Sequence, residues 1–362
     1  MSTSYIHSAN LLTGNANFGL DFVRQGRATT LETFWKKDAI AKLLDTNPDI
    51  KIFLDSGAHS LLNAQVGLIG TGDTVKTDKK DSQTFTREEF ANKLTVNQRI
   101  NYASKSSGAV QFFADWSFNQ NADVRKYLDE YIEFIHKYKS QLVGYVNLDI
   151  IYNAEESWEN QKYMESNGLR PIPVFHYGED FKWWRKYVDN YEYVGIGGVA
   201  GGITLQQFVT SLGNKAFEYI AETNPEVKVH GFAVTSVNLI KRFRFYSVDS
   251  TTWLKHAAYG NIMVPKYDVV NKRFDYCLTP FVISVSDISM VKASKNPHYT
   301  IAFPSQIIER IEEYLNLVGL DKEKLKTDNV ERGKANVIYF ENMLKDECIY
   351  KHSKLKSDNR LF

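Results

Sequence analysis

The chain has few cysteines, no long apolar run and almost no net charge. Its 362 residues include only Cys277 and Cys348, far apart, which exclude a disulfide framework and a multi-cysteine zinc site. No apolar run reaches the roughly 18 residues of a membrane-spanning helix, and no N-terminal signal pattern is evident. A formal net charge of +1 argues against a non-specific polyanion binder. We therefore expect a soluble, cytoplasmic protein that binds no membrane.

What the chain does contain is enough apolar material for a large core. Hydrophobic residues make up 43% and aromatic residues 14% of the sequence, and high aromatic content favours concave sites with stacking faces. The length fits one α/β barrel of roughly 250 residues with an appendage.

Eight short apolar runs alternate with helical patterns along the first 258 residues. The helical patterns cover 30–44, 86–104, 122–138, 154–166, 179–190 and 205–223. The apolar runs are Tyr5–Ser8, Lys51–Leu54, Val110–Ala114, Leu142–Leu148, Ile172–Phe175, Tyr193–Ile196, Val229–Val234 and Phe245–Val248. Alternating strands and helices imply a parallel sheet, and eight such units imply closure into a barrel. A doubly wound open sheet is the alternative, but no G-x-G-x-x-G follows an early strand.

The predicted fold is therefore α/β: a (β/α)8 TIM barrel over 1–258 and a C-terminal α+β extension over 259–362. The extension combines hairpin character at 273–278 and 281–285 with helices over about 304–318 and 332–345. A polar stretch at 67–83 follows the second predicted strand and reads as a long loop or lid.

The stretch from Val229 to Trp253 reads as strand, turn, short helix and strand. Thr235 and Ser236 can cap the helix. The second strand delivers Asp249 at its end, where barrel enzymes keep their catalytic groups. The alternative is that Asp249 caps the next turn, since Asp is a common capping residue.

Four predicted strands end in aspartate: Asp55, Asp115, Asp149 and Asp249. In a barrel all four would face one rim. Carboxylates crowded together shift one another's pKa values, so one can be a neutral acid while another stays ionised. This suits metal binding, or acid/base and nucleophile work at an anomeric carbon.

Glycines and histidines add candidates near the same rim. Gly197 and Gly198 open a glycine-rich run after the sixth strand, which is either a backbone approach to a ligand or a flexible turn. His176 and His230 could contact a ligand, although a lone strand histidine is more often a hydrogen-bonded core residue. His59 could orient Asp55 or contact substrate.

Three collinear segments resemble tRNA-guanine transglycosylases over about residues 50–255. Asp55-Ser56-Gly57-Ala58-His59-Ser60 resembles their D-S-G-G-F-Q motif, and the segment 196–202 resembles I-G-G-L-A-V-G. His230-Gly231-Phe232-Ala233, followed by a strand ending at Asp249, resembles their M-G-V-G segment and the strand ending in F-D.

The resemblance implies roles for these positions. Asp249 would be the nucleophile at C1′ of a guanosine, and Asp55 the general acid/base for the departing and incoming bases. Asp149 would recognise the base edge, and the Gly197–Gly198 backbone would contact the heterocycle. The other candidate substrate-binding residues are Ser56, Gly57, His59, Asp115, His176 and Gly231.

The departures from that family concern the parts that hold nucleic acid. The tRNA enzymes carry a C-x-C-x-x-C…H zinc site, which two distant cysteines cannot form. The chain therefore looks more like the phage and bacterial 7-deazaguanine DNA transglycosylases, which would place it in a host cytoplasm if phage-encoded. The implied reaction exchanges guanine in DNA for a free base such as preQ0, with no cofactor and no metal.

DNA as the partner requires a flipped or single-stranded guanine, because a stacked base cannot reach a barrel mouth. Lys241, Arg242 and Arg244 are candidate phosphate contacts, although a solvated helix face explains each of them singly. Three other readings remain: the same chemistry on tRNA, a barrel glycoside hydrolase or metal-dependent hydrolase, and a degenerate nucleic-acid-binding barrel. The oligomeric state is left open.

Overall fold

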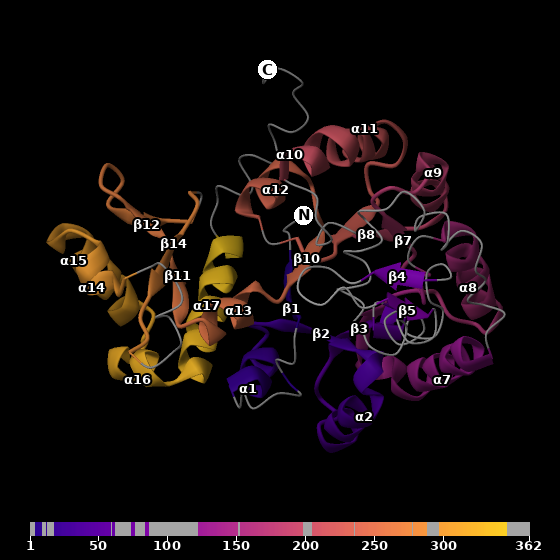
Figure 1. Ribbon diagram of the computed structural model, residues 1–362, viewed down its shortest axis with the longest axis horizontal. Helices are drawn as coiled ribbons and strands as arrows, with labels where there is room; N and C mark the ends of the chain where they lie inside the picture. Colours follow the sequence, from indigo (N-terminus) through magenta and orange to yellow (C-terminus); the bar gives the residue numbers. More distant parts are fainter. Residues whose placement is uncertain are drawn as a thin grey trace.

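The protein is built around an eight-stranded sheet, and all seven pairs of neighbouring strands in it are parallel (Figure 1). The computed structural model describes residues 4–8, 12, 18–58, 60–61, 74–76, 84–86, 122–150, 153–197, 205–234, 236–276, 278–287 and 297–345. The prediction of a parallel α/β sheet is confirmed.

The spatial order of the strands is β6, β3, β2, β1, β10, β9, β8, β7. The two end strands also meet, because Val146 after β6 forms a parallel bridge with Ile172 before β7. The Asn147 N–H donates to the Ile172 carbonyl at 2.9 Å, and the Ile172 N–H donates to the Tyr145 carbonyl at 2.9 Å. The strands span Ser4–Ser8 (β1), Thr29–Thr33 (β2), Ile52–Asp55 (β3), Leu142–Tyr145 (β6), Val174–His176 (β7), Tyr193–Gly197 (β8), Lys228–Gly231 (β9) and Ser247–Ser250 (β10).

One strand was wrongly predicted as helix. Thr29–Thr33 forms β2 between β1 and β3, and the helix α2 begins only at Lys37 and ends at Thr46. The threonines of this segment favour extended backbone, and pairing on both sides overrides the helical spacing that follows them. The predicted strand Val110–Ala114 lies outside the described residues.

The helices between strands follow their predicted bounds closely. α7 spans Ala122–Tyr138 and α8 spans Ala154–Ser166, as predicted, while α9 begins at Phe181 and ends at Asn190. The Asn153 side chain caps α8 and the Asp180 side chain caps α9, each accepting a backbone N–H of the first turn. The remaining helices of this part are α1 (Phe18–Arg24), α10 (Leu205–Phe208), α11 (Asn214–Thr223), α12 (Val237–Arg242) and α13 (Thr252–Ala258).

Two further expectations need correction. The single helix predicted for 205–223 is divided by a π-helical turn, Val209–Gly213. The stretch 67–83, predicted as a long loop or lid, contains the strand β4 (Thr74–Lys76), which pairs with β5 (Thr84–Thr86). Because Thr86 belongs to β5, the helix predicted from that residue does not begin there, and the rest of it lies outside the described residues.

The strands place apolar side chains on one face of the sheet, and polar side chains follow them toward the carboxyl ends. A buried cluster on this face consists of Ile6, Leu31, Phe53, Val146, Ile172 and Val174, which lie in the strands or directly beside them. Side chains two residues apart share a face of a strand. Asp55 therefore follows Phe53, and His176 follows Val174, on this face and nearer the carboxyl ends of the strands.

Helices pack against the other face of the sheet (Figure 1). The aromatic residues Trp183, Trp184 and Tyr187 of α9 are buried. The Trp184 indole N–H donates to the Ala216 carbonyl of α11 at 3.1 Å.

The C-terminal part contains two small antiparallel pairs and four helices, to one side of the large sheet in Figure 1. Both stretches that were expected to have hairpin character form antiparallel pairs: β12 (Lys266–Asp268) with β13 (Arg273–Asp275), and β11 (Asn261–Val264) with β14 (Phe281–Ser284). The helices are α14 (Tyr299–Ala302), α15 (Ser305–Leu317), α16 (Lys322–Thr327) and α17 (Asn329–Lys345). Among the described helices none is long and apolar enough to cross a membrane.

α17 joins this part to the sheet. It packs against α13, β11 and β1, and Glu341 forms an ion pair with Arg27 at 3.0 Å. Its buried residues belong to the same apolar cluster as Val194 of β8 and Val248 of β10. The C-terminal helix thus completes the core of the sheet.

Asn336 of α17 holds three backbone groups in the interior. Its side-chain oxygen accepts the Met263 N–H at 2.8 Å, and its amide donates to the carbonyls of Trp253 and Asn261.

Replacing Asn336 with alanine leaves these buried backbone groups unpaired. We predict that Asn336→Ala lowers the free energy of unfolding by about 2–4 kcal/mol in denaturant titrations. Asn329→Ala, at an exposed position of the same helix, should change it by less than about 0.5 kcal/mol; equal losses in both variants would contradict the role of Asn336.

Candidate active site

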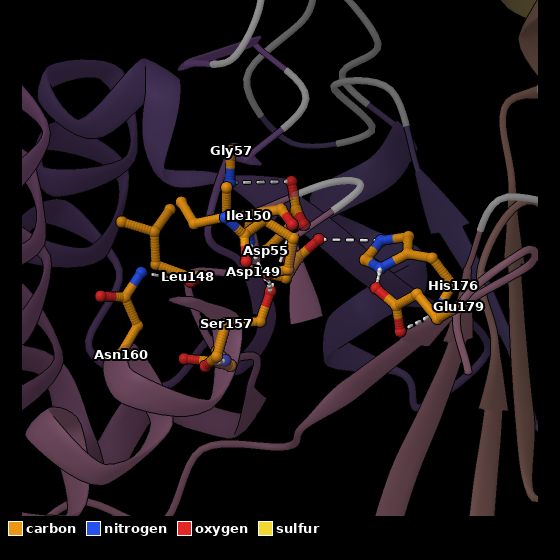
Figure 2. A network of polar contacts seen from close by, with 11 residues as sticks. Asp55, Gly57, Leu148, Asp149, Ile150, Ser157, Asn160, His176 and Glu179 are labelled. Carbon is orange, nitrogen blue, oxygen red and sulfur yellow. Dashed lines mark hydrogen bonds and ion pairs between the residues drawn. The ribbon is translucent and has the colours of Figure 1, made fainter. Parts of the chain in front are cut away.

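Three aspartates from the predicted set lie together at the carboxyl ends of the strands. Asp55 is the last residue of β3, Asp249 lies in β10, and Asp149 follows β6. Figure 2 shows the side chains of Asp55 and Asp149 close to each other. Repulsion from both Asp149 and Asp249 raises the pKa of Asp55, so all three share one electrostatic environment.

Among the carboxyl groups of the site, Asp55 has the pKa that its surroundings change most clearly. Burial raises its pKa to about 7, with further increases from Asp149 and Asp249. The Gly57 N–H donates to the carboxylate at 3.1 Å and opposes the shift. Part of the side chain still reaches solvent. Asp55 can therefore both hold and release a proton near neutral pH.

The turn after Asp55 requires glycine. Gly57 has a φ of 77°, a left-handed conformation that side chains disfavour. A Cβ there would lie 2.7 Å from the Tyr127 hydroxyl oxygen, which donates to the Ser56 carbonyl at 2.7 Å. The Ser56–Gly57 turn and Tyr127 thus fix where the Asp55 carboxylate lies.

Asp149 is paired with a histidine that also contacts a second carboxylate (Figure 2). The His176 Nε2 lies 2.9 Å from Asp149 Oδ2, and its Nδ1 lies 3.3 Å from Glu179 Oε1. Burial lowers the pKa of His176, but both carboxylates raise it, and the net result is about 10. His176 is therefore an imidazolium at neutral pH, and it keeps one Asp149 oxygen engaged.

The segment that carries Asp149 is held by α8 (Figure 2). The Ser157 hydroxyl oxygen accepts the Ile150 N–H at 2.8 Å, and the Asn160 amide donates to the Leu148 carbonyl at 2.9 Å. Both side chains are buried. The bonds on either side of Asp149 leave its backbone little freedom.

Asp249 is not a helix cap. The Thr252 N–H, at the start of α13, is bound by Ser250 instead. The Asp249 Oδ1 accepts the Ala233 N–H at 2.9 Å, and Ala233 has a φ of 56°, unusual for a residue with a side chain. At Gly231 a Cβ would lie 2.8 Å from both Phe245 and Val234. The loop after β9 is thus shaped to bring an N–H to Asp249.

His230, directly below that loop, is a fully buried core residue. Its Nε2 lies 3.3 Å from Asp249 Oδ1, near enough for an ion pair but without the alignment of a hydrogen bond. Its Nδ1 lies 2.6 Å from the Ser247 hydroxyl. Ser247, His230 and Asp249 thus contact one another in series. Ser247 is buried, however, and faces Nδ1, so this is not a hydrolase triad with an accessible serine.

The other predicted site residues divide into three groups. Gly197 adjoins the site, since a Cβ there would lie 3.0 Å from the His176 ring. His59, Asp115 and Gly198 lie outside the described residues. Arg242 and Arg244 precede β10 and so lie at the amino ends of the strands, opposite Asp249. There they donate to Asn214 and Pro225, and the Lys241 side chain is not described.

Sequence reasoning missed two residues near the site. Glu179 was taken only as the start of a helix, yet its carboxylate accepts the His176 N–H at 3.0 Å besides meeting the ring. The three-residue spacing behind a strand-end histidine was the available signal. Trp35, placed in a predicted helix, follows β2; it is 45% exposed and its ring centroid lies 6.2 Å from that of Tyr127.

In the described part of the chain, no group of three or more His, Cys, Asp or Glu side chains is arranged to hold a metal ion. No protein-family model matches the sequence, and neither does any curated protein.

The raised pKa of Asp55 makes stability depend on pH. Its folded-state value of about 7 exceeds the ordinary 3.8, so the native state binds the proton more tightly than the unfolded state. This contribution is complete below about pH 4, is lost as the pH rises to 7, and is at most about 4 kcal/mol. We predict that the free energy of unfolding of wild type falls between pH 5 and pH 8, and that it falls less in Asp55→Asn. Asp38→Asn, at an exposed position of α2, should leave the pH profile unchanged; identical profiles for wild type and Asp55→Asn would contradict the burial of a costly charge.

Proposed function

We propose that the protein is a transglycosylase that exchanges guanine in DNA for a 7-deazaguanine base such as preQ0, through a covalent bond between Asp249 and the deoxyribose. The observation that carries the proposal is the pairing of Asp55, whose pKa is about 7, with Asp249, which is held through one oxygen. One carboxyl group is suited to moving protons, and the other to attack.

The proposal includes closure of the sheet into a (β/α)8 barrel. The bridge from Val146 to Ile172 and the two backbone hydrogen bonds beside it support this, because they connect the two end strands. In a closed barrel, the carboxyl ends of all eight strands surround one mouth, the usual place for catalysis.

The chemistry takes two balanced steps. A free oxygen of the Asp249 carboxylate attacks C1′ while the bond from C1′ to guanine N9 breaks. The electron pair of that bond leaves with the base, which takes a proton from Asp55. The incoming 7-deazaguanine then gives a proton to Asp55 and attacks C1′, and the bond to Asp249 breaks. The intermediate retains the energy of the glycosidic bond, so no nucleotide hydrolysis is needed.

The proton shuttle asks Asp55 to be an acid in the first step and a base in the second. A group with a pKa near the working pH serves both directions, and a pKa of about 7 meets this need. An exposed aspartate, ionised at neutral pH, would rarely hold the proton that the departing base needs.

We assign recognition of the base to Asp149. Because His176 engages its Oδ2, its other oxygen remains to accept a hydrogen bond from the donor edge of a guanine. The Gly197 backbone adjoins His176 and fits close approach of a flat heterocycle. Trp35, exposed beside the Gly57 turn, is suited to stacking on a flipped or single-stranded base.

DNA is preferred to tRNA as the partner because two distant cysteines cannot form the zinc site of the tRNA enzymes. Arg242 and Arg244 would meet the DNA backbone only if the DNA reached around to the amino ends of the strands. A glycoside hydrolase would use the same two carboxyl groups with water in place of the second base.

Nucleoside mass spectrometry tests the proposal. Wild type is incubated separately with plasmid DNA and with tRNA, each with preQ0, and with preQ0 omitted as a control. We predict incorporation into DNA and a covalent protein–DNA adduct on a denaturing gel. Asp249→Ala should reduce incorporation at least about 1,000-fold, because no nucleophile remains. Asp38→Ala, at an exposed position, is the matched control.

Three results would decide against parts of the proposal. Incorporation into tRNA alone would leave the chemistry and change the substrate. Release of guanine without incorporation would indicate a hydrolase. Undiminished exchange by a folded Asp249→Ala variant would remove Asp249 as the nucleophile.

A further inference from the structure

A chain of buried polar groups runs from Asp249 into the interior of the sheet. Asp249 Oδ1 faces His230 Nε2, His230 Nδ1 faces Ser247, and the Ser247 hydroxyl is hydrogen-bonded to the Tyr193 hydroxyl. His230 is 0% exposed and is stacked on Phe53, with ring centroids 5.1 Å apart. Phe232 contacts its ring edge-on at 4.3 Å. The aromatic walls restrict the imidazole to one plane.

Either hydroxyl of the Tyr193–Ser247 pair can be the donor, and the order of donors in this chain depends on which of them donates. Burial raises the pKa of Tyr193, so its hydroxyl keeps its proton near neutral pH. If Tyr193 donates to Ser247, the serine proton is left to bond His230 Nδ1, which must then be an acceptor. The proton of a neutral imidazole then resides on Nε2, directed toward Asp249.

The His230 Nε2 atom is buried without a hydrogen-bond partner, although Asp249 Oδ1 lies 3.3 Å away. A buried polar atom of this kind costs free energy, so its retention calls for a role. Contacts in a site without substrate are often long or poorly aligned, and they shorten when substrate arrives. A small rotation of the Asp249 carboxylate would complete this one.

Resting on the proposed function, we infer that His230, set by Ser247 and Tyr193 as its Nε2–H tautomer, is a positioning residue for Asp249. Its Nε2 and the Ala233 N–H both lie beside Oδ1 and leave the second oxygen of Asp249 free to attack the anomeric carbon.

This arrangement stabilises the same oxygen throughout the exchange. When the free oxygen bonds to C1′, Oδ1 becomes the carbonyl oxygen of the ester. When the incoming base displaces Asp249, negative charge returns to the carboxylate, where the Ala233 N–H is already in place and His230 Nε2 lies 3.3 Å from Oδ1. Donors held close before the charge develops need little reorganisation during the reaction.

The tautomer can be measured without any activity. In protein labelled with 15N histidine, we expect His230 to show a protonated Nε2 and an unprotonated Nδ1, and Ser247→Ala to weaken that preference. His230→Leu assigns the signal. An Nδ1–H tautomer or an imidazolium in wild type would overturn the inference, whether or not the protein is a transglycosylase.

Kinetics of exchange into DNA test the positioning role. We expect His230→Leu to lower kcat about 100-fold with KM for the free base within about 3-fold, because a donor to the reacting carboxylate is lost. His230→Gln, which can return an N–H near the Nε2 position, should recover at least about 10-fold of that loss. His136→Leu, at an exposed position of α7, is the control.

These outcomes separate the inference from the proposed function. Active wild type with an equally active His230→Leu variant would overturn the positioning role alone. Equal losses in the Leu and Gln variants would indicate that His230 serves packing only. Wild type that exchanges no base would remove the proposed function, and the NMR result would then decide on the hydrogen-bonded chain by itself.

Discussion

Burial of neighbouring carboxyl groups, together with the repulsion between them, is the constraint around which the site is arranged. Asp55, Asp149 and Asp249 meet at one edge of the sheet, where little water is available to solvate their charges. Each has its own compensation. Asp149 has the imidazolium of His176, Asp249 has the Ala233 N–H, and Asp55 has the Gly57 N–H together with a proton that it keeps up to a pH of about 7. Unequal compensation gives chemically similar side chains different roles.

The compensation is built into the backbone. The N–H groups that reach Asp55 and Asp249 come from turns at Gly57 and Ala233, both with positive φ. Such turns cost free energy, which the apolar packing beneath them and the C-terminal helix α17 must offset. The same helix packs on α13, which directly follows the strand of Asp249. The C-terminal part therefore supports the site, although the three aspartates and the groups that contact them lie outside it.

The sequence predicted the parts of this arrangement that depend on local pattern. Regular apolar spacing and clear caps defined α7 and α8, and the aspartates at strand ends were recognisable from the strands before them. What it could not predict depends on contacts between distant segments. Thr29–Thr33 is a strand because β1 and β3 lie on either side of it, and His176 is an imidazolium because Asp149 and Glu179 enclose it. The place of Arg242 and Arg244 at the amino ends of the strands could have been read from the sequence, because both precede the strand that carries Asp249.

The account depends most on Asp55 holding its proton up to a pH of about 7. The most direct measurement is 13C NMR titration of aspartate carboxyl carbons, with Asp55→Asn to assign the signal. The account predicts a midpoint for Asp55 near pH 7. A midpoint near the ordinary value of 3.8 would show that the carboxylate is solvated and cannot carry the proton to a departing base, and the proposed mechanism would then be wrong.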